Sequence, residues 1–294
     1  ADGTALAQQA SARGLLSITE GGWAAAFEAE FGPWRRAHPH LPCLMAGMVG
    51  SRQGWVEAPY CPCPAGIADL ARQLLPLRPS LAGPGGPVFI VPGLSMDTSG
   101  VPDVMRGEET QAIGALRALG LVDATLVLPG THSKWLNVEA GQLKHFSTHM
   151  TGECYALIRQ HSILARSLPA TDQDWVPEAF DEGVRQAQQA GGLLHHLFSV
   201  RSLGLFDRLA PAAGASRLSG LLIGEELRAQ GLVAGQPVTV VGSAVLTSRY
   251  QRALGTLDMP VRTVGPDAAW LGLASLARQA GLVDIPSAPG LGGQ

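Results

Sequence analysis

Short apolar runs alternate with longer amphipathic segments along most of this chain, and this alternation limits the folds open to it. The run Val238–Val241 is followed by a Gly-Ser turn and a helix-like segment at 245–254, and Val261–Val264 is followed by another at 267–279. A short apolar run bounded by turn residues is typical of a buried strand, and repeated strand–helix units are typical of α/β proteins. We therefore expect an α/β fold in which helices flank the sheets.

The rest of the chain continues this pattern. We expect helices at 18–31, 67–75, 106–119, 152–166 and 216–229, and strands at 41–49, 55–60, 88–91, 124–128, 134–139 and 142–149. The last three strands are separated by turns at Gly130 and at Ala140-Gly141, which predicts a meander of two hairpins. A polar loop is expected at 92–105, and Thr151 is expected to cap the helix that follows it. Gly220 and Gly224, four residues apart, predict the close approach of a neighbouring backbone.

Length and charge exclude several classes of protein. With 294 residues, of which 46% are hydrophobic, the chain can bury a large core, and two domains are expected. The net charge of -3 gives no basic surface for nucleic acid or for an anionic membrane. No apolar run is long enough to span a bilayer, and the first residues lack the features of a secretory signal, so a cytoplasmic location is expected.

The cysteines and histidines do not form a metal-binding pattern. Cys61-Pro62-Cys63 is too tightly spaced for a zinc knuckle, and no second pair of cysteines follows it. His145 and His149 lie in a strand-like segment without a carboxylate to complete a ligand set. No protein-bound metal site is therefore predicted from these residue types.

Two adjacent acids lie at the start of the helix expected at 106–119. On a helix, Glu108 and Glu109 point about 100° apart, so only one of them is expected to face a substrate. A positioned carboxylate can accept the proton of an attacking hydroxyl in phosphoryl transfer, while the second acid holds Mg²⁺ through water or pairs with Arg106. Acids at this position can also simply complement the helix dipole.

A turn rich in hydroxyl groups follows that helix. It consists of Gly130, Thr131, His132, Ser133 and Lys134. A turn that begins with glycine exposes backbone N–H groups, and neighbouring hydroxyls can hold phosphate oxygens. A lysine adds a compact positive charge that can follow a transferred phosphoryl group. The alternative interpretation is an ordinary hairpin turn.

Two further polar segments follow expected strands. Ser51, Arg52, Gln53 and Trp55 offer a cation for a carboxylate, an amide for hydroxyls and an indole for one face of a sugar. Gly242 and Ser243 lie between a strand and a helix, where backbone N–H groups can meet phosphate or ribose. Each segment also fits a plain structural interpretation, as a solvated turn or as a simple strand-to-helix connection.

Familiar nucleotide and hydrolase motifs are absent from the chain. There is no G-x-x-x-x-G-K-[ST] phosphate loop, no G-x-G-x-x-G between a strand and a helix, and no G-x-S-x-G elbow. These absences argue against P-loop proteins, dinucleotide-binding folds and α/β-hydrolases.

The order of the polar segments resembles the sugar-kinase branch of the actin/Hsp70/hexokinase superfamily, and more narrowly the 2-dehydro-3-deoxygalactonokinase family. The strings that carry the resemblance are Met45-Ala46-Gly47-Met48-Val49-Gly50-Ser51 with Gly54-Trp55, Val104-Met105-Arg106-Gly107-Glu108-Glu109-Thr110-Gln111, Pro129-Gly130-Thr131-His132-Ser133-Lys134-Trp135, Met150-Thr151-Gly152-Glu153 and Leu218-Ser219-Gly220-Leu221-Leu222-Ile223-Gly224. They cover nearly the whole chain in order.

The resemblance implies two RNase-H-like domains, with mixed sheets flanked by helices and the active site in the interdomain cleft. It implies a sugar-acid-binding domain at residues 1–118 and a nucleotide-binding domain at 119–294. The implied reaction is ATP-dependent phosphorylation of the C6 hydroxyl of 2-dehydro-3-deoxy-D-galactonate in galactonate breakdown, with Mg²⁺. The implied partners are the sugar acid and ATP, with no nucleic acid and no membrane, and a homodimer is left open.

Roles for individual residues are also implied by the resemblance. Glu108 corresponds to the catalytic base, with Glu109 as the fallback because the match is loose by one position. Arg106 would neutralise the substrate carboxylate or the transferring phosphoryl group. The second phosphate hairpin would contain Gly130, Thr131, His132, Ser133 and Lys134, the adenosine motif Gly242 and Ser243, and the acid-sugar pocket Ser51, Arg52, Gln53 and Trp55.

One departure from the family pattern concerns the first residues. Relatives begin with a strand and a hairpin that carry an Asp-x-Gly-(Ser/Thr)-(Thr)-Asn motif, whereas Ala1-Asp2-Gly3-Thr4 follows no buried strand. We expect either a truncated chain or a protein that lacks one phosphate clamp and one strand. The alternatives are therefore a kinase of the same fold for another sugar or sugar acid, and a nucleotide-binding scaffold without turnover.

An aldolase for the same acid is disfavoured. Such an enzyme would need a Schiff-base lysine, and the only two lysines, Lys134 and Lys144, lie in the hairpin region.

Overall fold

The computed structural model describes residues 5–14, 17–19, 21–169 and 175–283. The segment Asp2-Gly3-Thr4 lies outside the described residues. The fold is a mixed α/β fold, as the sequence predicts, and it divides into two compact units. The first unit comprises Ala1–Asp123, Asn137–Phe146 and Pro266–Gln294, and the second comprises Ala124–Leu136 and Ser147–Gly265. In no described part of the chain is a helix both long enough and apolar enough to cross a bilayer.

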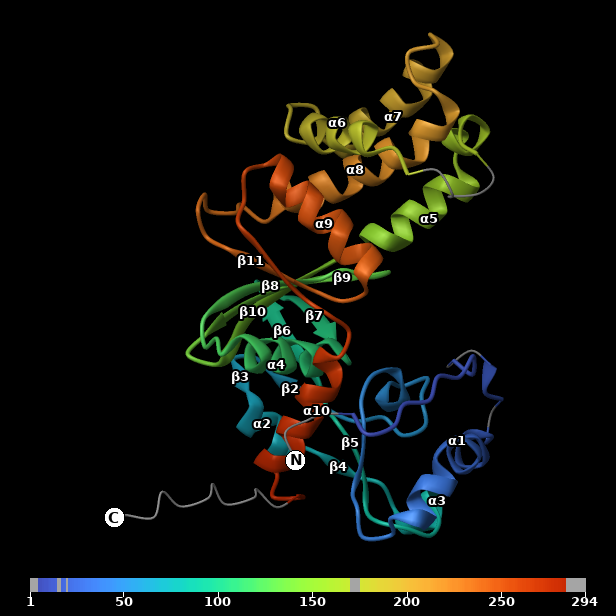
Figure 1. Cartoon of the computed structure of the whole chain (residues 1–294), viewed down its shortest axis with the longest axis vertical. Coiled ribbons are helices and arrows are strands. Elements are labelled where there is room, and N and C mark those ends of the chain that lie inside the picture. The colour runs from blue at the N-terminus through green and yellow to red at the C-terminus, as the bar shows by residue number, and fades with distance from the viewer. Residues whose placement is uncertain (1–4, 15–16, 20, 170–174, 284–294) are drawn as a thin grey trace. The chain divides into compact units, whose positions relative to one another are not determined.

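The first unit contains two small sheets and the helices around them (Figure 1). Its helices are α1 (Trp23–Ala37), α2 (Ile67–Arg72), α3 (Pro79–Ala82), α4 (Glu108–Leu119) and α10 (Ala268–Gln279), with a 3₁₀ turn at Met48–Gly50. One sheet has the order β1-β5-β4, from β1 (Cys43–Met45), β5 (Val88–Ile90) and β4 (Leu75–Pro76), with β1 parallel to β5. The other has the order β2-β6-β7, from β2 (Tyr60–Pro62), β6 (Gly93–Thr98) and β7 (Val101–Met105). Phe27, Leu77, Val88 and Ile90 form a buried apolar cluster in this unit.

The second unit is built on parallel strands covered by helices. Its strands are β8 (Ala124–Leu128), β11 (Val238–Val241) and β12 (Val261–Val264), and its helices are α5 (Thr151–His161), α6 (Pro177–Ala187), α7 (Gly192–Leu205), α8 (Pro211–Ala229) and α9 (Ala244–Thr256), with a 3₁₀ turn at Ile163–Ser167. Strand β11 pairs in parallel with both β8 and β12. These strands belong to a six-stranded sheet with the order β12-β11-β8-β9-β10-β3, which includes β9 (Ser133–Glu139), β10 (Gln142–His149) and β3 (Ala65–Gly66). Strand β3 and residues 137–146 of β9 and β10 belong to the first unit, so the chain passes from one unit to the other within β9 and β10.

Several strands match the sequence prediction, and others do not. The strands at 124–128, 142–149, 238–241 and 261–264 have the predicted bounds. The predicted strand at 55–60 is wrong, because only Tyr60 at its end is extended and joins β2. The polar loop predicted at 92–105 is instead the hairpin of β6 and β7, which turns at Ser99 and Gly100, both with positive φ. Only the base of this hairpin is buried, and its exposed outer half mixes polar and apolar residues without a regular alternation.

The start of helix α5 also differs from the prediction. Thr151 was expected to cap this helix, but Met150 is the N-cap residue and Thr151 lies in the first turn. The Thr151 hydroxyl instead donates a hydrogen bond to Glu226 on α8. The Thr151 side chain is therefore bonded to a distant carboxyl group and does not cap its own helix.

The last helix, α10, belongs to the first unit and lies beside α4 (Figure 1). The two helices approach each other closely at glycine residues. A methyl group placed on Gly114 would lie 1.7 Å from the Ala268 carbonyl oxygen, and one on Gly272 would lie 1.8 Å from the Thr110 oxygen. Only glycine allows helices to approach this closely. The sequence-based division into 1–118 and 119–294 places α10 with the second half, whereas compactness groups it with the first unit.

Close packing at glycine residues also brings α6 and α8 together in the second unit. A methyl group on Gly220 would lie 2.1 Å from the Phe180 carbonyl oxygen, and one on Gly224 would lie 2.9 Å from the Val184 Cα. The close backbone approach predicted from the spacing of Gly220 and Gly224 is thus confirmed.

We predict that Gly220→Ala destabilises the protein, because the added methyl group must push α6 away from α8. Overpacking of this kind costs about 1–3 kcal/mol. The matched control is Gly255→Ala on α9, where a methyl group would meet nothing within 4 Å. That control should be neutral or should raise the free energy of unfolding by up to ~1 kcal/mol. Urea unfolding of both variants is the measurement, and equal effects would contradict the packing argument.

Candidate active site

Helix α4 begins with the two predicted acids, but the structure gives them different surroundings. Glu109 is fully buried, at 0% exposure. Its Oε2 accepts the Gly107 N–H at 2.7 Å, and its Oε1 is buried without a hydrogen-bond partner among the described residues. Burial raises the pKa of Glu109 to about 8, more than its backbone hydrogen bonds lower it. Glu109 is therefore a neutral acid at pH 7.

Glu108 is only partly buried. Its Oε2 accepts the backbone N–H of Arg106 at 3.1 Å. No described contact closes its other oxygen off from solvent, so a substrate hydroxyl could reach this side chain. Of the two acids, Glu108 is the one whose position permits direct contact with a substrate.

Arg106 is nearly buried and packs within the first unit. Its Nη2 donates to the Ala58 carbonyl oxygen at 2.7 Å, and its guanidinium lies over the Tyr60 ring, 4.4 Å from the centroid. Its Nη1 lies beside Gly50, where a methyl group would come within 3.1 Å of it. Arg106 thus ties the start of α4 to the segment from Gly50 to Tyr60.

The residues predicted to contact the sugar acid have different surroundings in the structure. Arg52 and Gln53 are exposed, and Arg52 Nε lies 3.5 Å from a Glu57 carboxylate oxygen. The Ser51 hydroxyl donates to the Met48 carbonyl oxygen at 2.8 Å. Trp55 packs against Phe27, with ring centroids 5.2 Å apart, and belongs to the rim of the apolar cluster.

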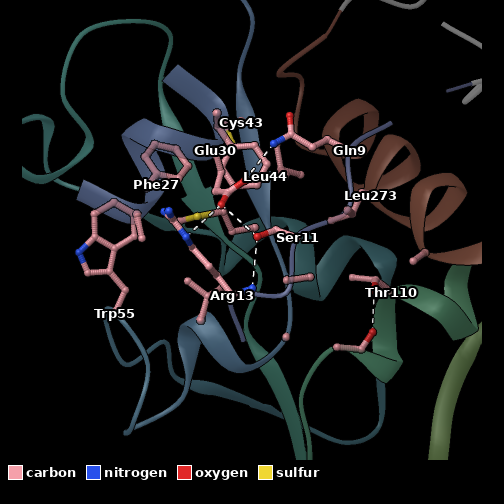
Figure 2. A pocket seen from close by; sticks show the side chains of 18 of the residues that line it. Gln9, Ser11, Arg13, Phe27, Glu30, Cys43, Leu44, Trp55, Thr110 and Leu273 are labelled. Carbon is pink, nitrogen blue, oxygen red and sulfur yellow. Dashed lines mark hydrogen bonds and ion pairs between the residues drawn. The ribbon is translucent and has the colours of Figure 1, made fainter. Parts of the chain in front are cut away.

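Trp55 also lines a cavity of about 580 Å³ in the first unit (Figure 2). The cavity runs along β1, which is the last strand of its sheet among the described residues. Its walls are mainly apolar, and its acid, Glu30, accepts hydrogen bonds from Gln9 at 2.9 Å and Ser11 at 3.0 Å. Arg13 Nε lies 3.6 Å from the same carboxylate. Because its walls are mainly apolar and Glu30 is already paired with Gln9, Ser11 and Arg13, this cavity is a poor match for a sugar acid with many hydroxyl groups.

In the second unit, two predicted phosphate-binding segments lie side by side. Strands β8 and β11 are parallel neighbours, with Val127 opposite Val240, so their carboxyl ends meet at one edge of the sheet. Pro129-Gly130 follows β8, and Gly242-Ser243 follows β11. A methyl group on Gly242 would lie 3.9 Å from the Pro129 carbonyl oxygen, which confirms their proximity. The carboxyl ends of parallel strands are the usual place for ligands in α/β sheets.

The loop after β8 is held by the start of α5. A methyl group on Gly152 would lie 2.3 Å from the Gly130 carbonyl oxygen, so only glycine permits this contact. The Glu153 N–H donates to the Thr131 carbonyl oxygen at 3.0 Å, and His132 Nε2 lies 2.5 Å from Glu153 Oε2. The side chains of Thr131 and His132 remain exposed at the tip.

The last two residues of this loop are buried. Ser133 has 0% exposure, and its hydroxyl is 2.9 Å from the Tyr250 hydroxyl. Lys134 Nζ donates to the Thr148 hydroxyl at 2.6 Å. Direct phosphate contact by Ser133 is not supported by this placement, because its hydroxyl is covered and already bonded.

One residue of this region, Glu226 on α8, was not identified from the sequence. Its side chain is buried and accepts hydrogen bonds from Trp135 Nε1 at 2.6 Å, from the Tyr250 hydroxyl at 2.7 Å and from Thr151. Burial and the nearby Glu226 raise the pKa of Tyr250 well above its usual value, so Tyr250 keeps its proton. The available signal was the pair of adjacent acids, Glu225 and Glu226, that follows the apolar run Leu221–Ile223 in the helix predicted at 216–229.

A small cavity of about 70 Å³ opens beside this network. It is lined by Pro129, Gly130, Thr151, Gly152, Tyr155, Ser219, Leu222, Ile223, Leu246, Arg249 and Tyr250. Its walls come from the loop after β8 and from α5, α8 and α9, so the same helices that surround Glu226 shape the space behind the loop.

Comparison with known proteins agrees with the sequence analysis. A family model described as 2-keto-3-deoxy-galactonokinase matches residues 1–276. A Rhizobium meliloti (strain 1021) protein named "Probable 2-dehydro-3-deoxygalactonokinase" is 36% identical over 284 residues, covering 94% of this chain and 90% of that protein. The Escherichia coli (strain K12) 2-dehydro-3-deoxygalactonokinase is 37% identical over 247 residues, covering 83% and 80% of the two chains.

A solved structure is similar as well. A crystal structure of a Sinorhizobium meliloti protein named for the same enzyme superposes with a TM-score of 0.84 at 35% identity, covering 93% of this chain and 91% of that one. The match of the family model over most of the length, the two curated relatives and the shared fold agree with one another. The chain therefore belongs to the 2-keto-3-deoxy-galactonokinase family.

Proposed function

We propose that this protein is a sugar-acid kinase that transfers the γ-phosphate of ATP to the C6 hydroxyl of 2-dehydro-3-deoxy-D-galactonate. The observation that carries the proposal is the family match over residues 1–276, which includes every candidate segment. The local geometry supports it, with an accessible acid at the start of α4 and glycine-led loops at neighbouring strand ends. The cytoplasmic location and the homodimer stay predictions.

Glu108 is the proposed base. A general base must be ionised and must reach the proton that it accepts. Glu109 meets neither condition, because it is fully buried and its pKa is raised to about 8. Arg106 is proposed to orient the start of α4, since its Nη2 donates to the Ala58 carbonyl oxygen and its guanidinium lies over the Tyr60 ring.

The second unit is proposed to bind ATP. Backbone N–H groups of the turn at Gly130 and Thr131 would hold phosphate oxygens, with His132 beside them and Lys134 adding positive charge. Gly242 and Ser243, at the adjacent strand end, would meet the adenosine. Ser133 is proposed to stabilise the loop through the hydrogen bond between its hydroxyl and that of Tyr250.

The first unit is proposed to bind the sugar acid through Ser51, Arg52, Gln53 and Trp55, of which Arg52 and Gln53 are exposed and Trp55 packs against Phe27. Mg²⁺ is part of the proposal. Within the described residues no group of three or more His, Cys, Asp and Glu side chains is gathered as a metal site. Kinases hold Mg²⁺ largely through substrate phosphates and one or two carboxylates, so a cluster of three such side chains is not required.

ADP release with a panel of sugars and sugar acids tests the proposal. We expect turnover with 2-dehydro-3-deoxy-D-galactonate and much slower turnover with its C4 epimer and with unmodified hexonates. Turnover with a different acid would identify another kinase of this fold. ATP binding by calorimetry without ADP release from any acid would instead favour a nucleotide-binding scaffold.

We predict that Glu108→Gln lowers kcat for ADP release by ~10²-fold or more, because a positioned base contributes at least that factor. The amide keeps the shape of the side chain and can still accept the Arg106 N–H. Glu139→Gln, at an exposed position at the end of β9, is the control and should leave kcat unchanged. A Glu108→Gln variant within a few-fold of the parent would refute the assignment.

We predict that Glu109 makes stability fall as pH rises. Its pKa of about 8 in the folded protein lies above the ordinary value of 4.5, so the folded state holds a proton that the unfolded chain releases between these values. The contribution of Glu109 to the free energy of unfolding is fully present below pH 4.5. It is lost progressively up to about pH 8, by at most about 1.4 kcal/mol per pH unit. Glu109→Gln should remove this slope.

Urea unfolding at several values between pH 5 and pH 8 measures this effect. The free energy of unfolding of Glu109→Gln, relative to the parent, should increase by a few kcal/mol across the range. Glu108→Gln serves as the control for removing an acid from the same helix start. Parallel pH profiles for the parent and Glu109→Gln would show that Glu109 is already ionised in the folded protein.

A further inference from the structure

Glu226 is the buried acid that accepts the most hydrogen bonds in the described part of the second unit. It is 2% exposed, and it receives hydrogen bonds from Trp135, Tyr250 and Thr151. Burying a carboxyl group is costly unless donors replace its water, and hydrogen bonds to charged groups are the stronger ones. Because its donors come from β9, α5 and α9, Glu226 links these three elements to α8.

Each donor to Glu226 is connected to the loop formed by residues 130–134. Trp135 directly follows Lys134 in β9. Thr151 precedes Gly152, which packs against the Gly130 carbonyl oxygen. The Tyr250 hydroxyl, besides donating to Glu226, is 2.9 Å from the Ser133 hydroxyl. The loop is therefore held through its beginning, its buried end and the strand that follows it.

We propose that Glu226 is a positioning residue that holds the loop at residues 130–134 in the conformation that receives the phosphates of ATP. The inference rests on the proposed function, since it assumes that this loop binds ATP. Glu226 itself is covered and does not touch the nucleotide. It acts through Trp135, Thr151 and Tyr250, which come from three different elements.

Steady-state kinetics of Glu226→Leu and Glu226→Gln test this role. Leucine removes all three acceptor interactions, so KM for ATP should rise about 10-fold or more, as expected for losing several buried hydrogen bonds. Glutamine can accept from Trp135 and donate to the hydroxyls of Tyr250 and Thr151, so it should restore most of the loss. KM for the sugar acid should stay within twofold of the parent.

Two further variants sharpen the test. Glu225→Gln, the preceding residue, removes only a surface ion pair with Arg228 and should leave both KM values unchanged. Tyr250→Phe keeps the ring but removes the hydroxyl that links Glu226 to Ser133, and should raise KM for ATP about 3-fold or more, as expected for losing one buried hydrogen bond. If Glu226→Leu does not fold, Tyr250→Phe decides the question.

Calorimetric titration with ATP separates this inference from the proposed function. If the parent binds ATP but no acid is phosphorylated, the function is wrong, and the Kd for ATP of the same variants still tests Glu226. Unchanged affinity for ATP in Glu226→Leu and Tyr250→Phe, or an equal rise in both KM values, would overturn the positioning role. A parent that does not bind ATP would overturn both.

Discussion

The free energy needed to bury an acid is the constraint on which both candidate regions depend. Glu226 lies among donors from three elements, and each of its oxygens accepts at least one hydrogen bond. The Glu109 carboxyl group accepts the backbone N–H of Gly107, its second oxygen has no partner among the described residues, and burial raises its pKa to about 8. The same residue type therefore holds elements together at one position and remains protonated at the other.

Glycine determines how closely the helices and the loop at residues 130–134 approach their neighbours. Gly114 and Gly272 let α4 and α10 touch through their backbones, and Gly220 does the same for α8 on α6. Gly152 lets the start of α5 approach the carbonyl group of Gly130. A side chain at any of these positions would separate elements that carry the candidate residues, so the packing of the helices and the shape of the loop have a common cause.

Much of the local structure was predictable from the sequence, because it depends on neighbouring residues. The strands at 124–128 and 238–241 are short apolar runs bounded by turn residues, and the structure has them with the same bounds. The hairpin of β6 and β7 was missed because its outer half is exposed and mixes polar and apolar residues, so it lacks the alternation that identifies a strand. Likewise, the role of Thr151 depends on Glu226, 75 residues away, and no local pattern contains that partner.

By itself, the sequence determined the family, the α/β class and the segments in which the candidate residues lie, because motif strings and hydrophobic periodicity are properties of contiguous residues. Only the tertiary structure decided the burial and the hydrogen-bond partners of each member of these segments. In the folded protein Glu108 is partly exposed, whereas Glu109 is buried. Ser133 is buried although the tip of its loop is exposed, and its hydroxyl connects the loop to Glu226 through Tyr250. Exposure, pKa and hydrogen-bond partners depend on residues distant in the chain, and only folding brings those residues together.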